Sequence, residues 1–247
     1  MGHKRLWGKC ENWIWTGIFL LALLIFVGLS FDYYYDLNDD VLMKDILAGV
    51  YTGKPEGHNI QMLWLVSAFV SLLYRLAQGF PWYGLFLCFC QYGSLALIAH
   101  RSLGFCRTKK VKALLLLTEG LLFAGLYLNH LTAVQYTLVC TLTASVAAFL
   151  FMTTDIKLST GEFIRKNTGA VLLVSLAYLI RSEMLLLVLP MICAAGVIKW
   201  GSEEKIFIWE HTRKYLTVIG AILAGIVIGQ VSHRIAYGSE EWQRFTE

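Results

Sequence analysis

The most regular feature of the sequence is a series of long apolar runs, each nearly free of charge and followed by a short polar segment. Eight runs stand out, at about residues 13–30, 60–76, 82–99, 111–128, 136–151, 169–180, 184–197 and 216–231. A helix that crosses a bilayer needs about 20 mostly apolar residues. The pattern therefore predicts an all-α polytopic membrane protein in which residues 1–247 form a single transmembrane domain, without a soluble domain.

The composition supports this class of protein. Hydrophobic residues make up 57% of the chain and charged residues only 15%, whereas soluble domains carry about 25% charged residues. These values exclude a soluble enzyme, a disordered tail, a collagen-like repeat and a module that binds nucleic acid. The six cysteines form no CxxC pair, so the sequence indicates neither a disulfide framework nor a zinc site.

The charges of the polar segments predict the orientation. The first run follows a basic tail and continues into the acidic segment 31–36 without a cleavage site, so we expect an uncleaved first helix. If the run 60–76 does not cross, seven crossings with a cytoplasmic N-terminus place 15 of the 21 Lys and Arg residues on the cytoplasmic side. Such an excess is what the positive-inside rule requires. Eight crossings with an external N-terminus place about 14 there and remain the alternative. We prefer seven crossings in a cell membrane, expected to be a bacterial cytoplasmic membrane.

The preferred topology leaves residues 31–80 as a long loop on the outer face, between the first two crossings. Residues 41–51 of this loop carry apolar side chains at helical spacing and predict a short amphipathic helix. The turn at 52–57 is expected to end it. The loop is also the most acidic part of the chain, with Asp32, Asp36, Asp39, Asp40, Asp45 and Glu56.

Asp39 and Asp40 stand a few residues beyond the first apolar run. Helix capping accounts for one of them, since Asp is a common N-cap and an acidic first turn suits the helix dipole. Carboxylates at the surface of an apolar membrane domain could also have a catalytic role. They could supply the base for an acceptor nucleophile, or ligands for a hard divalent cation such as Mg²⁺ or Mn²⁺. The local sequence leaves both interpretations open.

A basic tail, one membrane helix and an acidic pair at the start of a long outer loop together resemble the GT-C superfamily of membrane glycosyltransferases. Members carry a short acidic motif in that loop, and Asp39-Asp40-Val41 is similar to its DDx form. They also place an apolar helix there after a His/Pro-containing turn, as residues 54–59 and the run 60–76 do. The resemblance implies that Asp39 and Asp40 are catalytic and that the donor is a polyprenyl-phosphate-linked sugar. Members commonly continue into a C-terminal part that has no counterpart here, so we expect the N-terminal module.

Further polar residues beside or within the apolar runs are candidates for the site. Arg181 divides two runs, and its planar guanidinium suits a lipid phosphate. A rim ion pair with Glu183, or simple snorkelling to the interface, is the alternative. His58 and His130 fall in outer segments and are candidates for contacts with substrate, although a loop histidine is more often simply solvated. Glu119, inside a run, suits an ion pathway or a hydrogen bond between helices.

The sequence therefore favours a membrane glycosyltransferase that acts on the extracytoplasmic face, with a polyprenyl-phosphate sugar as its donor and the lipid bilayer as its surroundings. In this interpretation Asp39 is the base or orients the acceptor, Asp40 is its partner or a metal ligand, and Arg181 contacts the donor phosphate. Two alternatives of other classes remain open. Charges within the apolar runs suit a transporter or flippase, and the short chain suits a non-catalytic membrane scaffold.

Overall fold

The computed structural model describes residues 2–36, 38–202 and 209–239, and most of them are helical. Two strands, β1 (Tyr34–Tyr35) and β2 (Ala133–Val134), pair in parallel. The helices are α1 (Gly2–Ser30), α2 (Asn38–Ala48), α3 (Trp64–Leu76), α4 (Trp82–Leu103), α5 (Lys109–Leu122), the π-helix η1 (Phe123–Tyr127), α6 (Leu128–Thr132), α7 (Tyr136–Met152), α8 (Thr160–Ile180), α9 (Ser182–Ser202) and α10 (Trp209–Ala236).

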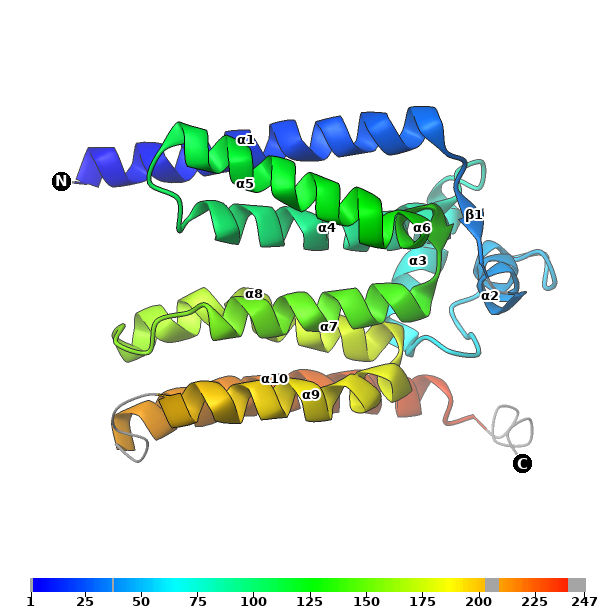
Figure 1. Cartoon of the computed structure of the whole chain (residues 1–247). Coiled ribbons are helices and arrows are strands. Elements are labelled where there is room, and N and C mark those ends of the chain that lie inside the picture. Colours follow the sequence, from blue (N-terminus) through cyan, green and yellow to red (C-terminus); the bar gives the residue numbers. More distant parts are fainter. Residues whose placement is uncertain (1, 37, 203–208, 240–247) are drawn as a thin grey trace.

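The long helices lie side by side along a common axis (Figure 1). α2, α3 and β1 gather at one end of this bundle, which we call the α2 end, and the α4–α5 connection lies at the other, the far end. Among the described residues, six helical segments are long and apolar enough to cross a membrane: Cys10–Ser30, Trp82–Leu103, Lys109–Thr132, Thr160–Ile180, Ser182–Lys199 and Trp209–Ala236. α3 and α7 are shorter apolar helices.

This architecture confirms the all-α class for the described part of the chain, and its six candidate spans agree with a multi-pass membrane protein. Six of the eight predicted apolar runs fall in these long segments. The runs 60–76 and 136–151 instead form the shorter helices α3 and α7. The number of crossings, and the side of the membrane that each end of the bundle faces, stay predictions.

α2 begins and ends earlier than the predicted helix at residues 41–51. Gly49 follows its last residue with a φ of +82°, and a Cβ there would lie 2.2 Å from the backbone carbon of Lys54. Only glycine fits such a position, which explains why the helix stops there. Val50 and Tyr51 lie beyond this turn and are exposed.

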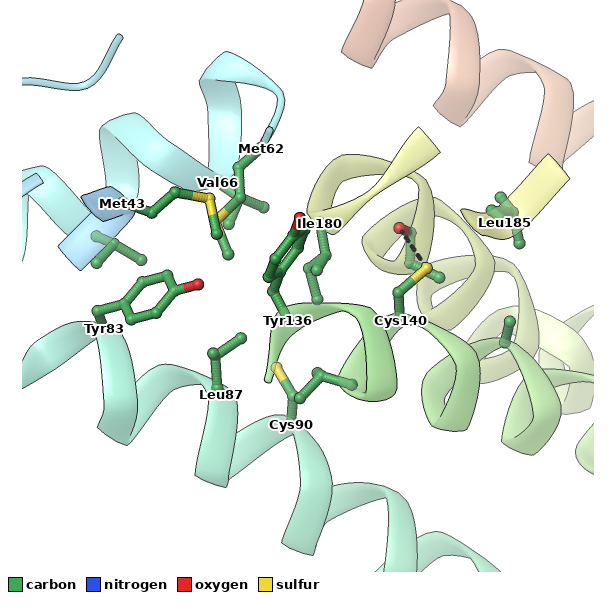
Figure 2. Packing of buried hydrophobic residues seen from close by; sticks show 14 of the residues in the cluster. Met43, Met62, Val66, Tyr83, Leu87, Cys90, Tyr136, Cys140, Ile180 and Leu185 are labelled. Atoms are coloured by element: carbon green, nitrogen blue, oxygen red, sulfur yellow. Dashed lines mark hydrogen bonds between the residues drawn. The ribbon is translucent and has the colours of Figure 1, made fainter. Parts of the chain in front are cut away.

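Buried side chains from several helices meet at the α2 end. Met43 of α2 and Val66 of α3 belong to one apolar cluster with Tyr83 of α4, Tyr136 of α7 and Ile180 of α8 (Figure 2). The side chains of Met43, Tyr83 and Tyr136 are fully buried. Burying one large apolar side chain contributes about 1.5–3 kcal/mol. The cluster therefore holds α2 and α3 firmly on the long helices.

α10 packs closely along α8 through two glycines. A Cβ at Gly225 would lie 2.3 Å from Ser175 Oγ, and one at Gly229 would lie 2.7 Å from Leu179 Cδ2. Small residues four positions apart let helix backbones approach closely in membrane proteins. The end of α10 thereby reaches the α2 end, where the carbonyl of Ala236 contacts His58.

The short strand pair joins two segments that lie far apart in the sequence. Tyr34 lies opposite Ala133, and Tyr35 lies opposite Val134. The pair places the segment that leads into α2 beside the segment that leads into α7. This contact brings the acidic residues near the start of α2 to the first residues of α7.

Candidate functional site

Asp40, in the first turn of α2, is a fully buried carboxylate. Its Oδ1 accepts a hydrogen bond of 2.7 Å from the Tyr83 hydroxyl on α4 and one of 3.2 Å from the backbone N–H of Tyr136 on α7. Its Oδ2 is also buried and has no hydrogen-bond partner among the described residues. Asp40 therefore links α2 to two long helices.

The surroundings of Asp40 favour its neutral form. Burial raises its pKa to about 6, as the largest of several effects. The hydrogen bonds from Tyr83 and Tyr136 lower this pKa, whereas the negative charges of Asp39 and Asp36 raise it. A carboxyl group with such a pKa changes its charge in mildly acidic solution.

Asp39 differs from its neighbour because its side chain is exposed. It also lies in the first turn of α2, where the positive end of the helix dipole stabilises a carboxylate. An exposed carboxylate at the end of the bundle can accept a proton from a bound hydroxyl group. Of the two predicted catalytic acids, Asp39 is the one that an external substrate can contact.

Arg181 follows the last residue of α8 and is half-buried. Its Nη1 donates a hydrogen bond to the Thr137 hydroxyl, and its guanidinium carbon lies 4.8 Å from the centre of the Tyr136 ring. Within the described residues it forms no ion pair, and the alternative pair with Glu183 is not formed. The guanidinium thus keeps N–H groups for an anion.

Tyr136 joins the acidic turn to the arginine. Its backbone N–H donates to Asp40, while its ring lies beside the guanidinium of Arg181. Asp39 directly precedes Asp40 in the first turn of α2, and Arg181 directly follows α8. The structure therefore brings together three of the predicted site residues from α2 and the α8–α9 junction, and we call this group the Asp39–Arg181 site.

The two predicted histidines occupy different positions at the same end. His130 lies on α6, where its ring contacts Tyr127 and its carbonyl accepts from the Gln91 side chain at 2.8 Å. The β1–β2 pair places its segment near the start of α2. His58 instead contacts Glu56 Oε1 through Nδ1 at 2.6 Å and the carbonyl of Ala236 through Nε2 at 3.0 Å. His58 therefore fastens its segment to α10, and a substrate role for either histidine stays a prediction.

The acidic pair does not form a ready cage for a divalent cation. Mg²⁺ and Ca²⁺ take six or more oxygen ligands. Asp40 Oδ1 is occupied by two donors, and its Oδ2 is buried. In the part of the chain that the structure describes, no three His, Cys, Asp or Glu side chains are arranged to hold a metal ion.

An apolar groove of about 950 Å³ is lined by residues of α1, α3, α4 and the strand pair. Aromatic side chains dominate its walls, and Phe69 and Phe89 are also exposed on the outer surface of the helices. Tyr35 in its wall packs against Tyr83, the residue that donates to Asp40. The groove and Asp40 are thus connected through the contact between Tyr35 and Tyr83.

Comparisons with known proteins do not assign the chain to a family. No protein-family model matches the sequence, and neither a curated protein nor a solved structure matches it significantly.

Sequence reasoning missed Tyr83 and Tyr136. Both stand at the start of an apolar run, where an aromatic residue is the ordinary side chain of a membrane interface. Only the pairing of β1 with β2 and the packing of α2 on α4 reveal their contacts with Asp40. To predict these two contacts from the sequence, one would need to know which apolar runs are neighbours in space.

Proposed function

We propose that this protein is a membrane glycosyltransferase of the GT-C type, which moves a sugar from a polyprenyl-phosphate donor to an acceptor at the α2 end. The observation that carries the proposal is the meeting of the Asp39–Asp40 turn and Arg181 at Tyr136. The carboxylate suits a nucleophile that must lose a proton, and the guanidinium suits the phosphate that must leave.

The proposed reaction is a direct displacement at the anomeric carbon of the donor sugar. Asp39 accepts the proton of the acceptor hydroxyl group. At the same time the oxygen of that hydroxyl group forms the new bond to the anomeric carbon. The bond between the carbon and the phosphate oxygen breaks, and the electron pair leaves with the polyprenyl phosphate. Arg181 stabilises the charge that develops on the phosphate, since charge-assisted hydrogen bonds are stronger than neutral ones. Afterwards the proton passes from Asp39 to water.

The apolar groove supports a substrate with a long hydrocarbon chain. It is lined almost wholly by apolar and aromatic groups, and it lies beside helices that are apolar enough to cross a bilayer. Its volume of about 950 Å³ is large enough for part of a hydrocarbon chain. Its apolar walls suit such a chain better than a sugar, whose hydroxyl groups require polar partners. A lipid-linked donor can therefore lie in the bilayer with its phosphate near the α2 end.

The same proposal includes a topology. We propose seven crossings in a cell membrane, with the N-terminus in the cytoplasm and the α2 end on the outer face. α3 then lies at the outer end of the bundle without crossing, and α7 crosses although it is short. The excess of basic residues in the segments that this topology leaves in the cytoplasm supports it.

Substitution of Asp39 tests the proposed activity. Purified protein in lipid nanodiscs is supplied with a set of polyprenyl-phosphate hexoses and pentoses, with a membrane extract as the source of acceptors. We expect the wild type to remove sugar from at least one donor, and Asp39→Asn to lower this rate by about 100-fold or more. Asp32→Asn, a change to another exposed acid of the same segment, serves as the control and retains activity. Absence of transfer with every donor contradicts the proposed function.

A further inference from the structure

α2 contacts the bundle in two physically different ways. Met43 and Leu47 are fully buried, and Asp40 precedes them by three and seven residues on the same buried face. Burial of apolar surface is non-directional, so it selects the face of α2 that turns toward the bundle but sets the rotation of the helix only loosely. Hydrogen bonds depend on both distance and angle. The two bonds to Asp40 Oδ1 therefore fix how α2 is turned on the bundle.

These two bonds lead to different helices. The hydroxyl of Tyr83 on α4 is one donor, and the backbone N–H of Tyr83 is itself bonded to the Tyr74 hydroxyl on α3 at 3.2 Å. The other donor is the N–H of Tyr136, whose ring lies beside Arg181. One buried carboxylate thus connects the helix that carries Asp39 to the residue that contacts the arginine.

We propose that Asp40 is a positioning residue, which sets the Asp39 carboxylate at a fixed place relative to the Arg181 guanidinium and takes no part in the chemistry itself. This inference rests on the proposed function of the Asp39–Arg181 site, and it replaces the catalytic role that the acidic pair implied for Asp40. A fully buried carboxylate that accepts two hydrogen bonds cannot reach a substrate while those bonds persist. Asp39, about 100° away around the helix, is exposed and can.

The burial of Asp40 also has a cost that a purely apolar residue would avoid. Its Oδ2 has no hydrogen-bond partner among the described residues, and leaving a buried polar group unsatisfied is unfavourable. Met43 and Leu47 already supply apolar packing for α2. The directional bonds of Asp40 are therefore best explained by the orientation that they give to the helix.

The proposal predicts different kinetics for two substitutions. Asp40→Asn keeps a carbonyl oxygen that can accept both bonds, whereas Asp40→Ala removes the acceptor. A misplacement of about 1 Å at a reacting group can lower a rate about 100-fold. We expect Asp40→Ala to lower kcat by about 10–100-fold with the donor KM changed by less than about threefold, and Asp40→Asn to retain at least about a third of kcat.

Hydrogen–deuterium exchange of the protein in nanodiscs tests the same contact without an enzyme assay. We expect the Tyr136 amide and the amides of α2 to exchange faster in Asp40→Ala and in Tyr83→Phe, and to regain protection in Asp40→Asn. Tyr83→Phe removes one hydroxyl donor and carries the test if Asp40→Ala does not fold. Tyr178→Phe is the matched control, because its hydroxyl donates to Gln230 at 3.0 Å and not to Asp40.

Two results would overturn the positioning role. One is unchanged exchange of α2 and of the Tyr136 amide in both Asp40→Ala and Tyr83→Phe. The other is a loss of transfer in Asp40→Asn as severe as that in Asp39→Asn, which would assign chemistry to Asp40. If the wild type transfers no sugar at all, the proposed function fails, and the exchange measurements alone still decide whether Asp40 orients α2.

Discussion

Two adjacent carboxylates of α2 have opposite surroundings. Asp39 is exposed, whereas Asp40 is fully buried beneath Tyr83 and beside the first turn of α7. In the sequence the two acids look equivalent, since both precede an amphipathic stretch. The rotation of about 100° between consecutive helical residues separates them once one face of α2 is buried. Position on the helix thus decides which acid a substrate can contact.

The buried carboxyl predicts a dependence of stability on pH. Because burial raises the pKa of Asp40 from 3.8 to about 6, the folded state holds this proton more tightly than the unfolded state does. The contribution of the protonated Asp40 carboxyl group to the free energy of unfolding is fully present below about pH 4. It is lost as the pH rises through about 6. We expect the wild type to lose on the order of 3 kcal/mol of unfolding free energy between pH 4 and pH 7, relative to Asp40→Asn.

Thermal unfolding in detergent at several pH values between 4 and 7 measures this difference. Asp40→Asn is the reference because the other titrating groups are the same in both proteins. The difference in Tm between the wild type and Asp40→Asn should become less favourable to the wild type as the pH rises. Parallel curves for the two proteins would show that Asp40 does not titrate in this range.

The sequence was sufficient to identify the charged residues of the site, but not the residues that they contact. Asp39, Asp40 and Arg181 stood out because a charge next to an apolar run is unusual. The contact between Asp40 and Tyr83 joins residues 43 positions apart. No local pattern of charge or polarity contains such information, so the site could be predicted only as a set of isolated candidates.

Among the helices, α10 offers the sharpest test of packing. A Cβ at Gly225 would lie 2.3 Å from Ser175 Oγ and 3.2 Å from its Cβ on α8, whereas a Cβ at Gly220 of the same helix meets nothing within 4 Å. We expect Gly225→Val to destabilise the protein by about 1–3 kcal/mol, because overpacking forces the helices apart. Gly220→Val is the control. Equal values of Tm for the two variants would contradict the close packing of α8 and α10.

The sequence predicted that the long helices exist, but it did not predict where they begin and end. Apolar runs predicted the six long segments because a bilayer sets a minimum length. α4 and α10 extend past their runs into polar residues, where hydrophobicity carries no signal for a helix. The two-residue strands were not predicted at all, since a strand pair this short has no periodicity.

Basic side chains of several helices gather at the far end of the molecule. At the far end, Arg101, Lys199 and Lys214 donate hydrogen bonds to the residues that connect α7 and α8. At the α2 end, the first turn of α2 carries Asp39 and Asp40. The positive-inside rule expects basic residues on the cytoplasmic side, so the proposed topology places the far end there.

Reporters inserted at two exposed positions test this orientation. Gly53 lies in the turn after α2, and Arg107 lies in the α4–α5 connection at the far end (Figure 1). We expect a reporter at Gly53 to be accessible from outside the cell and one at Arg107 to be accessible only from the cytoplasm. A cytoplasmic reporter at Gly53 would remove the basis for transfer on the outer face.

The proposed function depends most on the binding of the phosphate of a lipid-linked donor by Arg181. The most direct measurement is the affinity of the nanodisc-embedded protein for a polyprenyl-phosphate hexose, in the wild type and in three variants. Since hydrogen bonds to charged groups contribute about 1.5–3 kcal/mol, we expect Arg181→Ala to bind about 10–100-fold more weakly. Arg181→Lys keeps the charge without the planar fork and should be intermediate. Glu183→Ala should bind like the wild type, because the two side chains form no ion pair. Equal affinity of the wild type and Arg181→Ala would contradict the claim.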